Sequence, residues 1–387
     1  MKKLILLLII ILILPGCYNY KELNEIAISS AMGIDKINDE YIITIQIINT
    51  EKNNENSNAG QTKFTNYEGR GKNIQEAIRN LTNNVPKHIY PNSMQILIIN
   101  EEIAKEGIYD ILDFFFRKTE SNKQVYPLIS KNTKANDILN TITPIVTLNS
   151  NKIKDSLILN STYYGVSKPI TLEELLKIYL NPNKEFTLPS IYIKNNNKDY
   201  DNLENLEKTN TDTTIILGPT AIFKSDKLIG YLTEEESINL NIYNNSVENA
   251  ILTTNCDENN YSIELTNIKT KTSINNNTAN ININADGRLV EITCNYDLEN
   301  NKIIDEMNKK SEENLNNKIT ETINKIINEY NSDVLGFMDK LYKYNYKFYN
   351  KINNKYEYFK NLKINVNSKI NINSKGNLTK VIKNEKD

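Results

Sequence analysis

The stretch KIIDEMNKKSEENLNNKITETINKIINEY, residues 302–330, carries the strongest helical pattern in this chain of 387 residues. Its apolar residues recur every three or four positions and form one stripe, while Lys, Glu and Asn fill the other faces. The stripe consists of Ile303, Met307, Leu315, Ile319, Ile323, Ile326 and Tyr330. That spacing predicts a long amphipathic helix with one face packed against a core.

The segments on both sides of this helix have the alternating pattern of half-buried strands. Residues 261–272 and 280–294 precede the helix, and residues 362–372 follow it. Within the second of these strands, the pair Asp286-Gly287 predicts a tight turn or a bulge. Strands followed by a long helix and a last strand indicate α+β packing in the C-terminal part of the chain.

The first half of the chain alternates between strand-like and helix-like segments, which predicts a mixed α/β region. The predicted strands cover residues 25–34, 41–49, 64–70, 95–99 and 126–130. The predicted helices cover residues 72–83, 101–116 and 171–180. The sequence TLEE, residues 171–174, resembles a capping box shifted by one position at the start of the last of these helices.

A polar segment, residues 194–213, has no sustained apolar face and is the predicted linker. It separates an N-terminal α/β region, residues 17–193, from a C-terminal α+β region, residues 214–387. The second region is expected to divide near residue 250 into a small middle domain and a C-terminal domain. The chain is therefore predicted to have a multi-domain α+β fold with three domains, each a mainly antiparallel or mixed sheet covered by helices.

Composition argues against several classes of function. The 46 Lys and Arg residues nearly balance the 48 Asp and Glu residues, whereas a nucleic-acid binder needs a basic face. The single histidine, His88, excludes a multi-His metal site and leaves only one centre for a His-dependent triad. No glycine-rich phosphate loop is present. We therefore expect a non-enzymatic protein with no metal and no catalytic residues.

The N-terminus has the pattern of a lipoprotein signal. Lys2 and Lys3 precede an apolar run, residues 4–14, which is too short to span a bilayer, and Pro15-Gly16-Cys17 follows. We expect residues 1–16 to be removed and Cys17 to carry a covalent lipid, the only added group that the sequence predicts. The mature protein would then be extracytoplasmic, anchored to a membrane, and of formal charge about −4 after the loss of two lysines. The alternative is an ordinary cleaved signal followed by a chance cysteine.

Two further cysteines, Cys256 and Cys294, each end a strand-like stretch. Outside the cytosol such a pair can form a disulfide, but two buried free thiols fit the sequence equally well. The sequence leaves both alternatives open.

The stretch from Tyr342 to Phe359 interleaves aromatic residues with lysines. Aromatic residues beside lysines bind RNA or membrane headgroups, and the near-neutral charge and the expected extracytoplasmic location argue against RNA. Core packing combined with a protein or membrane-proximal contact is the favoured interpretation.

Short motifs along the chain, from YNYKELNE at residues 18–25 to DKLIG ending at residue 230, resemble those of the Ger(x)C spore germination lipoproteins. The stretch after Cys17, YNYKELNE (residues 18–25), is similar to the family's opening, and AMGID (residues 31–35) is similar to the turn after its first strand. MQILI (residues 94–98) and LDFFFR (residues 112–117) resemble its next strand and its Phe-rich helix. The most specific match is GPTAIFK followed by DKLIG, between residues 218 and 230. The positions that carry the resemblance are Glu22, Leu23, Gly33, Asp35, Gln95, Arg117, Phe223 and Gly230.

The chain departs from this family mainly where many relatives carry tryptophan. Tyrosine stands there instead, at Tyr18, Tyr231, Tyr349 and Tyr356. The change keeps a flat apolar ring and adds a hydroxyl group, so the fold expectation is unaffected while any indole-specific contact is lost.

The resemblance implies the C subunit of a GerA-type germinant receptor. Such a subunit is lipid-anchored on the outer face of the spore's inner membrane, has three α/β domains and no known catalytic activity, and works with two multi-spanning subunits, A and B. The alternative function is a substrate-binding lipoprotein of an uptake system, which would need two similar α/β lobes around a cleft. The sequence identifies neither the germinant nor the face that meets the partners.

Overall fold

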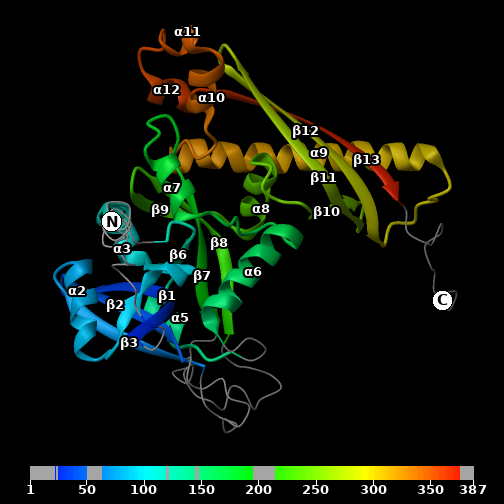
Figure 1. Ribbon diagram of the computed structural model, residues 1–387. Coiled ribbons are helices and arrows are strands. Elements are labelled where there is room, and N and C mark those ends of the chain that lie inside the picture. The colour runs from blue at the N-terminus through cyan, green and yellow to red at the C-terminus, as the bar shows by residue number, and fades with distance from the viewer. Residues whose placement is uncertain are drawn as a thin grey trace, which may run out of the picture.

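A computed structural model describes residue 22 and residues 25–49, 63–118, 122–143, 148–194 and 214–374. These residues form two β-sheets with helices packed against them, and the long helix α9 (Asn301–Lys325) lies along the second sheet (Figure 1). The α+β class predicted from the sequence is confirmed.

The first sheet has nine strands within the described ranges, in the order β3-β2-β1-β5-β6-β7-β8-β9, with β4 paired to the start of β1. The strands are β1 (Ile26–Ile37), β2 (Glu40–Ile48), β3 (Phe64–Gly71), β4 (His88–Tyr90), β5 (Ile96–Asn100), β6 (Tyr126–Ser130), β7 (Thr187–Lys194), β8 (Thr214–Lys224) and β9 (Lys227–Tyr231). Its centre is parallel, because β1, β5, β6 and β7 run in one direction. The flanking pairs at both ends are antiparallel.

Helices cover both faces of this sheet. They are α2 (Ile74–Asn80), α3 (Glu101–Glu106), α4 (Tyr109–Arg117), α5 (Ala135–Asn140), α6 (Asn149–Tyr163) and α7 (Leu172–Tyr179), with short 3₁₀ turns η3 (Leu81–Asn83) and η4 (Pro91–Ser93). Strand β5 has apolar side chains on both faces, so both faces must be covered. Leu97 and Ile99 belong to the core under α2, α3 and α4. Ile96 and Ile98 belong to the core under α5 and α6. A central parallel strand buried on both sides reads as a continuous apolar run.

The second sheet has the order β10-β11-β12-β13. Its strands are β10 (Ala250–Cys256), β11 (Asn259–Asn275), β12 (Thr278–Ile292) and β13 (Lys363–Ser374). The first three are antiparallel neighbours, and β13 returns parallel to β12 after α9 has crossed over the sheet. Helix α9 buries Met307, Leu315 and Ile319 of the predicted stripe in this core and ends in a π-helical turn, η6 (Ile326–Tyr330).

Further helices connect and extend the second sheet. Helix α8 (Glu234–Tyr243) precedes it, and α10 (Phe337–Tyr344), α11 (Tyr346–Tyr349) and α12 (Lys355–Lys360) lie between η6 and β13. Thr233 and Glu236 form a capping box at the start of α8, and Thr171 and Glu174 form the predicted one at the start of α7. In each box the threonine hydroxyl and the glutamate satisfy backbone N–H groups that have no partner inside the helix.

The predicted linker does not separate two sheets. Residue 194 belongs to β7 and pairs with Thr214 of β8, so the chain re-enters the first sheet directly after residues 195–213, which lie outside the described residues. The second sheet begins at Ala250, the point where the sequence suggests a further division. Polar composition identifies a segment without an apolar face, but it does not reveal that the strands before and after it are neighbours. The three-domain division stays a prediction.

Two local expectations are refined. Strand β1 continues to Ile37, and the turn to β2 is made by Asn38 and Asp39, both with positive φ. Strand β12 runs through Asp286-Gly287, where its register against β13 shifts between Gly287 and Arg288. The predicted irregularity is thus a bulge-type shift and not a turn.

Candidate functional site

The residues that carry the family resemblance lie at several separate places in the structure. Cys17 and Leu23 are outside the described residues, and Glu22 is exposed just before β1. The other six positions stand in or beside the first sheet, and five of them have a structural role that the geometry shows.

Asp35 near the end of β1 caps helix α5. Its carboxylate accepts hydrogen bonds from the backbone N–H groups of Ala135 and Asn136, each at 2.9 Å, and from the Asn100 side chain at 2.9 Å. Gly33 favours this close approach, because a Cβ atom there would lie 3.1 Å from the Cβ of Ala135, a tight contact. Burial raises the pKa of Asp35 above its ordinary value, and the three hydrogen bonds act in the opposite direction. The Gly-Ile-Asp motif therefore fixes α5 on the sheet.

Replacing Asp35 by alanine is expected to lower the free energy of unfolding by about 2 kcal/mol, because two N–H groups and one amide lose their acceptor. Urea denaturation of the purified protein measures this change. Asp35→Asn keeps one acceptor oxygen and serves as the control, with a smaller loss expected. Equal urea midpoints for the wild type and Asp35→Ala would contradict the capping role.

Gln95 and Phe223 hold neighbouring elements together. The Gln95 backbone donates to Ser30 and accepts from Tyr126, each at 2.9 Å, and so extends the pairing of β5 on both sides. Phe223 of β8 is fully buried and stacks on Phe186, with ring centroids 4.6 Å apart. Both positions stabilise the first sheet.

Gly230 on β9 makes room for the end of the long helix. A Cβ atom at this position would lie 2.6 Å from the Tyr330 ring, and the Tyr330 hydroxyl donates to the Tyr231 carbonyl at 2.6 Å. Glycine at residue 230 therefore allows η6, which continues α9, to pack against the edge of the first sheet.

Three of the four tyrosines at family tryptophan positions lie in the described part of the chain. The ring of Tyr231 lies under the Lys131 ammonium group, 4.6 Å from it, and burial raises the pKa of its hydroxyl. The Tyr349 hydroxyl donates to Asn183, and the Tyr356 hydroxyl accepts from Asn331. The hydroxyl groups of Tyr349 and Tyr356 thus take part in contacts that an indole could not make in the same way.

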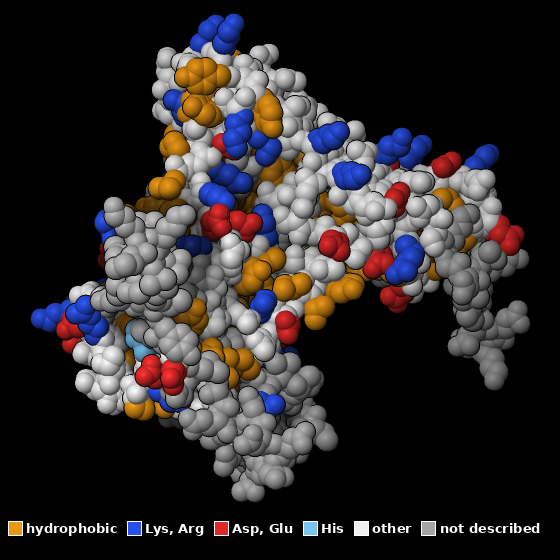
Figure 2. Space-filling model, viewed as in Figure 1, with side chains coloured by type: hydrophobic (Ala, Val, Ile, Leu, Met, Phe, Trp, Pro, Cys, Tyr) orange, Lys and Arg blue, Asp and Glu red, His pale blue; other side chains and the backbone are white. Residues whose placement is uncertain are grey.

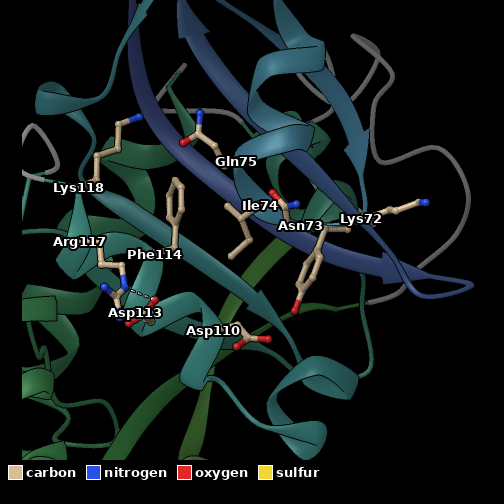
Figure 3. A pocket seen from close by; sticks show the side chains of 10 residues that line it. Lys72, Asn73, Ile74, Gln75, Asp110, Asp113, Phe114, Arg117 and Lys118 are labelled. Atoms are coloured by element: carbon tan, nitrogen blue, oxygen red, sulfur yellow. Dashed lines mark hydrogen bonds and ion pairs between the residues drawn. The ribbon is translucent and has the colours of Figure 1, made fainter.

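Arg117, the sixth of these positions, is exposed beside a pocket of about 690 Å³ between β2, α2 and α4. Figure 3 shows Phe114 beside Ile74. On one side of Phe114, Arg117 forms an ion pair with Asp113, with 2.7 Å between the nitrogen and the oxygen. The pocket is lined by Tyr41, Lys72, Asn73, Ile74, Gln75, Asp110, Asp113, Phe114, Arg117 and Lys118. An apolar floor with a rim of both charges is suited to contact with another molecule.

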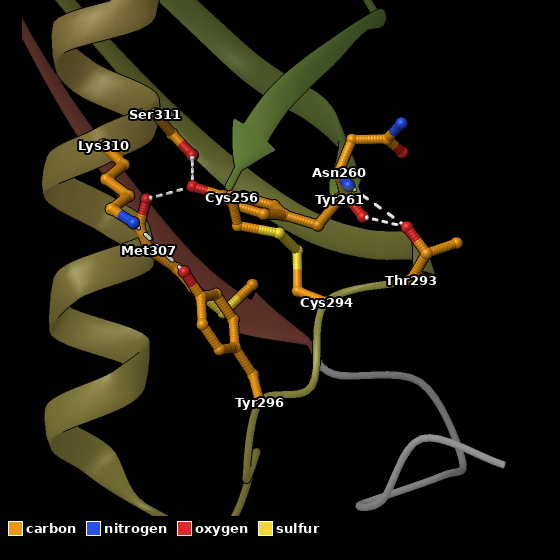
Figure 4. The surroundings of a disulfide bond; sticks show 9 residues. All are labelled: Cys256, Asn260, Tyr261, Thr293, Cys294, Tyr296, Met307, Lys310 and Ser311. Carbon is orange, nitrogen blue, oxygen red and sulfur yellow. Dashed lines mark hydrogen bonds between the residues drawn. A yellow bond between two sulfur atoms is a disulfide. The ribbon is translucent and has the colours of Figure 1, made fainter. Parts of the chain in front are cut away.

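Cys256 and Cys294 are joined by a disulfide in the structure, with their Cα atoms 6.2 Å apart (Figure 4). The bond links the end of β10 to the chain that leaves β12. Beside it, the Tyr261 hydroxyl donates to the Met307 carbonyl at 2.8 Å and lies 3.0 Å from the Ser311 hydroxyl. The disulfide therefore closes the second sheet next to its contact with α9.

The two sheets meet at a polar junction below α10. The Asp333 carboxylate accepts from the backbone N–H groups of Phe337 at 2.9 Å and Met338 at 2.8 Å and so caps α10. The Asp333 carbonyl accepts from the Glu185 N–H at 3.1 Å, and Asn181 donates to Asp339 at 2.8 Å. Burial raises the pKa of Asp333 to about 6, because loss of water penalises the charged carboxylate more than the hydrogen bonds favour it.

This shift predicts that the junction is more stable in acid. The folded protein holds the Asp333 proton up to about pH 6, whereas the unfolded chain releases it near its ordinary pKa of 3.8. The contribution is complete below pH 4 and is lost as the pH rises through 6, a change on the order of 2 to 3 kcal/mol. Urea denaturation between pH 4 and 7 should show the wild type losing stability relative to Asp333→Asn. A pH-independent difference between the two proteins would contradict this assignment.

The remaining candidates are a catalytic role for His88, a metal site and a membrane-spanning helix. His88 is exposed on the short strand β4, where its backbone pairs with the start of β1. Within the ranges that the structure describes, no group of three His, Cys, Asp or Glu side chains is arranged to hold a metal ion. None of the helices described there combines the length and the apolar composition that a membrane-spanning helix needs.

Comparison with known proteins gives matches along most of the chain. The family model "Spore germination protein N-terminal domain" matches residues 19–193, and "Spore germination B3/GerAC like, C-terminal" matches residues 219–376. Spore germination protein KC of Bacillus subtilis (strain 168) is 30% identical over 241 residues, which are 60% of this chain and 59% of that protein. Putative spore germination protein YfkR of the same organism is 24% identical over 238 residues, or 60% of this chain and 58% of its own length.

The aligned region therefore spans about three fifths of the length of these curated relatives. Among solved structures, the crystal structure of the GerBC protein has a TM-score of 0.52 at 15% identity, and the match covers 89% of this chain and 97% of that chain. This likeness concerns the fold alone. Because the two domain models follow one another in order along the chain, the protein belongs to the Ger(x)C family of spore germination proteins.

Proposed function

We propose that this chain is the C subunit of a GerA-type germinant receptor, a non-enzymatic, lipid-anchored protein required for spore germination. The observation that carries the proposal is the ordered match of both germination-protein domains, residues 19–193 and 219–376, shortly after Cys17 of the predicted lipoprotein signal. The subunit would lie on the outer face of the spore's inner membrane. It would act through contacts with two multi-spanning subunits, A and B.

The proposed mechanism is restricted diffusion. Two acyl chains on Cys17 would hold the protein stably at the membrane, whereas one chain binds only marginally. Confinement to the membrane raises the effective concentration of the folded sheets near membrane-embedded partners, and modest contacts then suffice for assembly. The lipid is a covalent anchor, and the proposal requires no other cofactor.

The structure supports this function over uptake of a substrate. A substrate-binding lipoprotein of the expected kind has two similar lobes around a cleft. Here the first sheet has a parallel centre and the second is mainly antiparallel, and the described residues give the first sheet nine strands and the second only four. Two such different sheets do not form a pair of similar lobes.

Co-purification from dormant spores tests the proposal. The chain, with an affinity tag after its last residue, would be extracted from the inner-membrane fraction in mild detergent. Recovery of two multi-spanning membrane proteins in constant ratio is the expected result. Recovery with a membrane transporter and its ATPase, and without those two proteins, would favour the uptake function and overturn the receptor assignment.

A further inference from the structure

The helices α10, α11 and α12 form a projection at one end of the molecule, which we call the tip and define as residues 337–363 (Figure 1). One side of the tip is part of the core of the second sheet. Phe337, Leu341 and Phe359 are buried there. Core packing therefore accounts for this side of the tip and leaves the outer side to be explained.

The outer side of the tip presents tyrosines to solvent. The sequence YKYNYK, residues 342–347, is exposed at every position. The exposed fractions are 45% for Tyr342, 85% for Tyr344 and 54% for Tyr346. The Tyr342 and Tyr346 rings meet edge to face with centroids 5.4 Å apart. Tyr342 also meets the buried ring of Tyr349 edge to face, with centroids 5.2 Å apart, so aromatic packing holds these exposed rings in place on the core.

The tip also concentrates positive charge. It contains seven lysines and two acidic residues, a formal charge of +5 in a chain whose total is −2, so all other residues together carry −7. The lysines are Lys340, Lys343, Lys347, Lys351, Lys355, Lys360 and Lys363. Figure 2 shows lysine side chains beside hydrophobic ones at this end of the molecule.

The acidic residues of the tip do not neutralise this surface. Asp339 pairs with Lys343 at 2.7 Å, and the Glu357 carboxylate accepts from the Asn354 side chain at 3.4 Å at the start of α12. Among the residues that the structure describes, Lys347, Lys351 and Lys360 have no acidic partner within ion-pair distance. Their charges are available to an external anion.

We propose that the tip is a second membrane contact, which docks on the headgroup region of an anionic lipid bilayer. Tyrosine has an apolar ring and a polar hydroxyl, which suits the boundary between headgroups and acyl chains. Lysine places its ammonium group at lipid phosphates while its alkyl stem lies along apolar surface. The negative charge of the other residues favours an orientation with the tip toward the bilayer. The inference rests on the membrane location proposed above and adds a contact made by the protein itself.

A fluorescent probe on the tip tests this contact in the full chain. Tyr344→Cys would be labelled with a nitrobenzoxadiazole fluorophore, and the lipidated protein would be mixed with vesicles of phosphatidylcholine, with or without phosphatidylglycerol. Tyr163→Cys at the end of α6, where the tyrosine is 66% exposed, is the matched control. Flotation of the vesicles reports attachment through Cys17, and the emission of the probe reports the environment of the tip.

The expected result is a blue shift at residue 344 on vesicles that contain phosphatidylglycerol, with none at residue 163. High salt, which screens charges, should reverse the shift, and Lys347→Glu combined with Lys351→Glu should abolish it. Protein that floats while the probe at residue 344 stays in water would overturn the tip contact alone. A shift that needs the A and B subunits would also overturn it, because the tip would then be a protein interface. Failure to float would instead contradict the lipid anchor and the proposed function.

Discussion

Replacement of Cys17 by alanine is expected to remove the protein from the membrane and to slow germination strongly, while the folded sheets stay intact. The variant has no thiol for lipid attachment, and the two acyl chains that would hold the protein at the membrane are lost with it. Fractionation of spore membranes with immunodetection measures the first effect. The loss of optical density of a spore suspension after addition of nutrients measures the second.

A neighbouring substitution provides the control for this experiment. Tyr18→Ala changes the residue after the cysteine and keeps the thiol, so membrane attachment should persist. Thermal unfolding of the Cys17→Ala protein should match that of the wild type, because the first strand that the structure describes begins only at Ile26. Normal germination by spores that carry only Cys17→Ala would rule out a required anchor.

Loss of the disulfide between Cys256 and Cys294 is expected to have the largest effect on stability. The bond closes a loop between residues 38 positions apart, and its removal should lower the free energy of unfolding by about 2 to 4 kcal/mol. Urea denaturation of the double variant Cys256→Ser with Cys294→Ser measures this loss. The effect should be confined to the second sheet, whose strands β10 and β12 the bond connects.

Reductant distinguishes the disulfide from two buried thiols. It should lower the stability of the wild type to that of the double serine variant and leave the variant unchanged. Thiol titration of the denatured, unreduced protein should detect neither Cys256 nor Cys294. Detection of both as free thiols would show that the pair is reduced and would contradict the predicted loss.

The residue pattern predicts the individual elements of this fold well. The apolar stripe between residues 302 and 330 becomes α9 and η6, and the continuous apolar run of β5 becomes a strand buried on both faces. The spacing of threonine and glutamate correctly locates the start of α7. These features depend on residues close together in the sequence, and periodicity reports which side of an element is buried.

Contacts between distant residues are not predictable in this way. Asp35 caps a helix that starts 100 residues later, and Gly230 faces a tyrosine 100 residues away. The residues next to Asp35 and Gly230 in the sequence form no pattern that identifies the distant partner of either residue. The sequence does not predict the pairing of β7 with β8 for the same reason. A polar segment has the same composition whether it connects neighbouring strands or separate domains.

The candidate site illustrates the same limit. Resemblance to a family identified eight positions, yet most of those that the structure describes stabilise the first sheet, and only Arg117 lies exposed beside a pocket. The lysine and tyrosine pattern of residues 342–359 indicated a protein or membrane-proximal contact, but sequence alone could not tell which rings face solvent. The structure separates buried Phe337 and Phe359 from exposed Tyr344.

The pairing of β7 with β8 determines how this protein can be divided for expression. The two domain models end at residue 193 and begin at residue 219, which invites a cut between them. A fragment that stops at residue 193 would leave β7, an apolar inner strand, as a bare edge with unpaired backbone groups, and such edges join other chains and aggregate. A fragment extended to residue 231 would keep β8 and β9 and end on the edge strand that the whole protein uses. The end point of a soluble fragment is therefore determined by the strands of the first sheet and not by the border between the two matched domains.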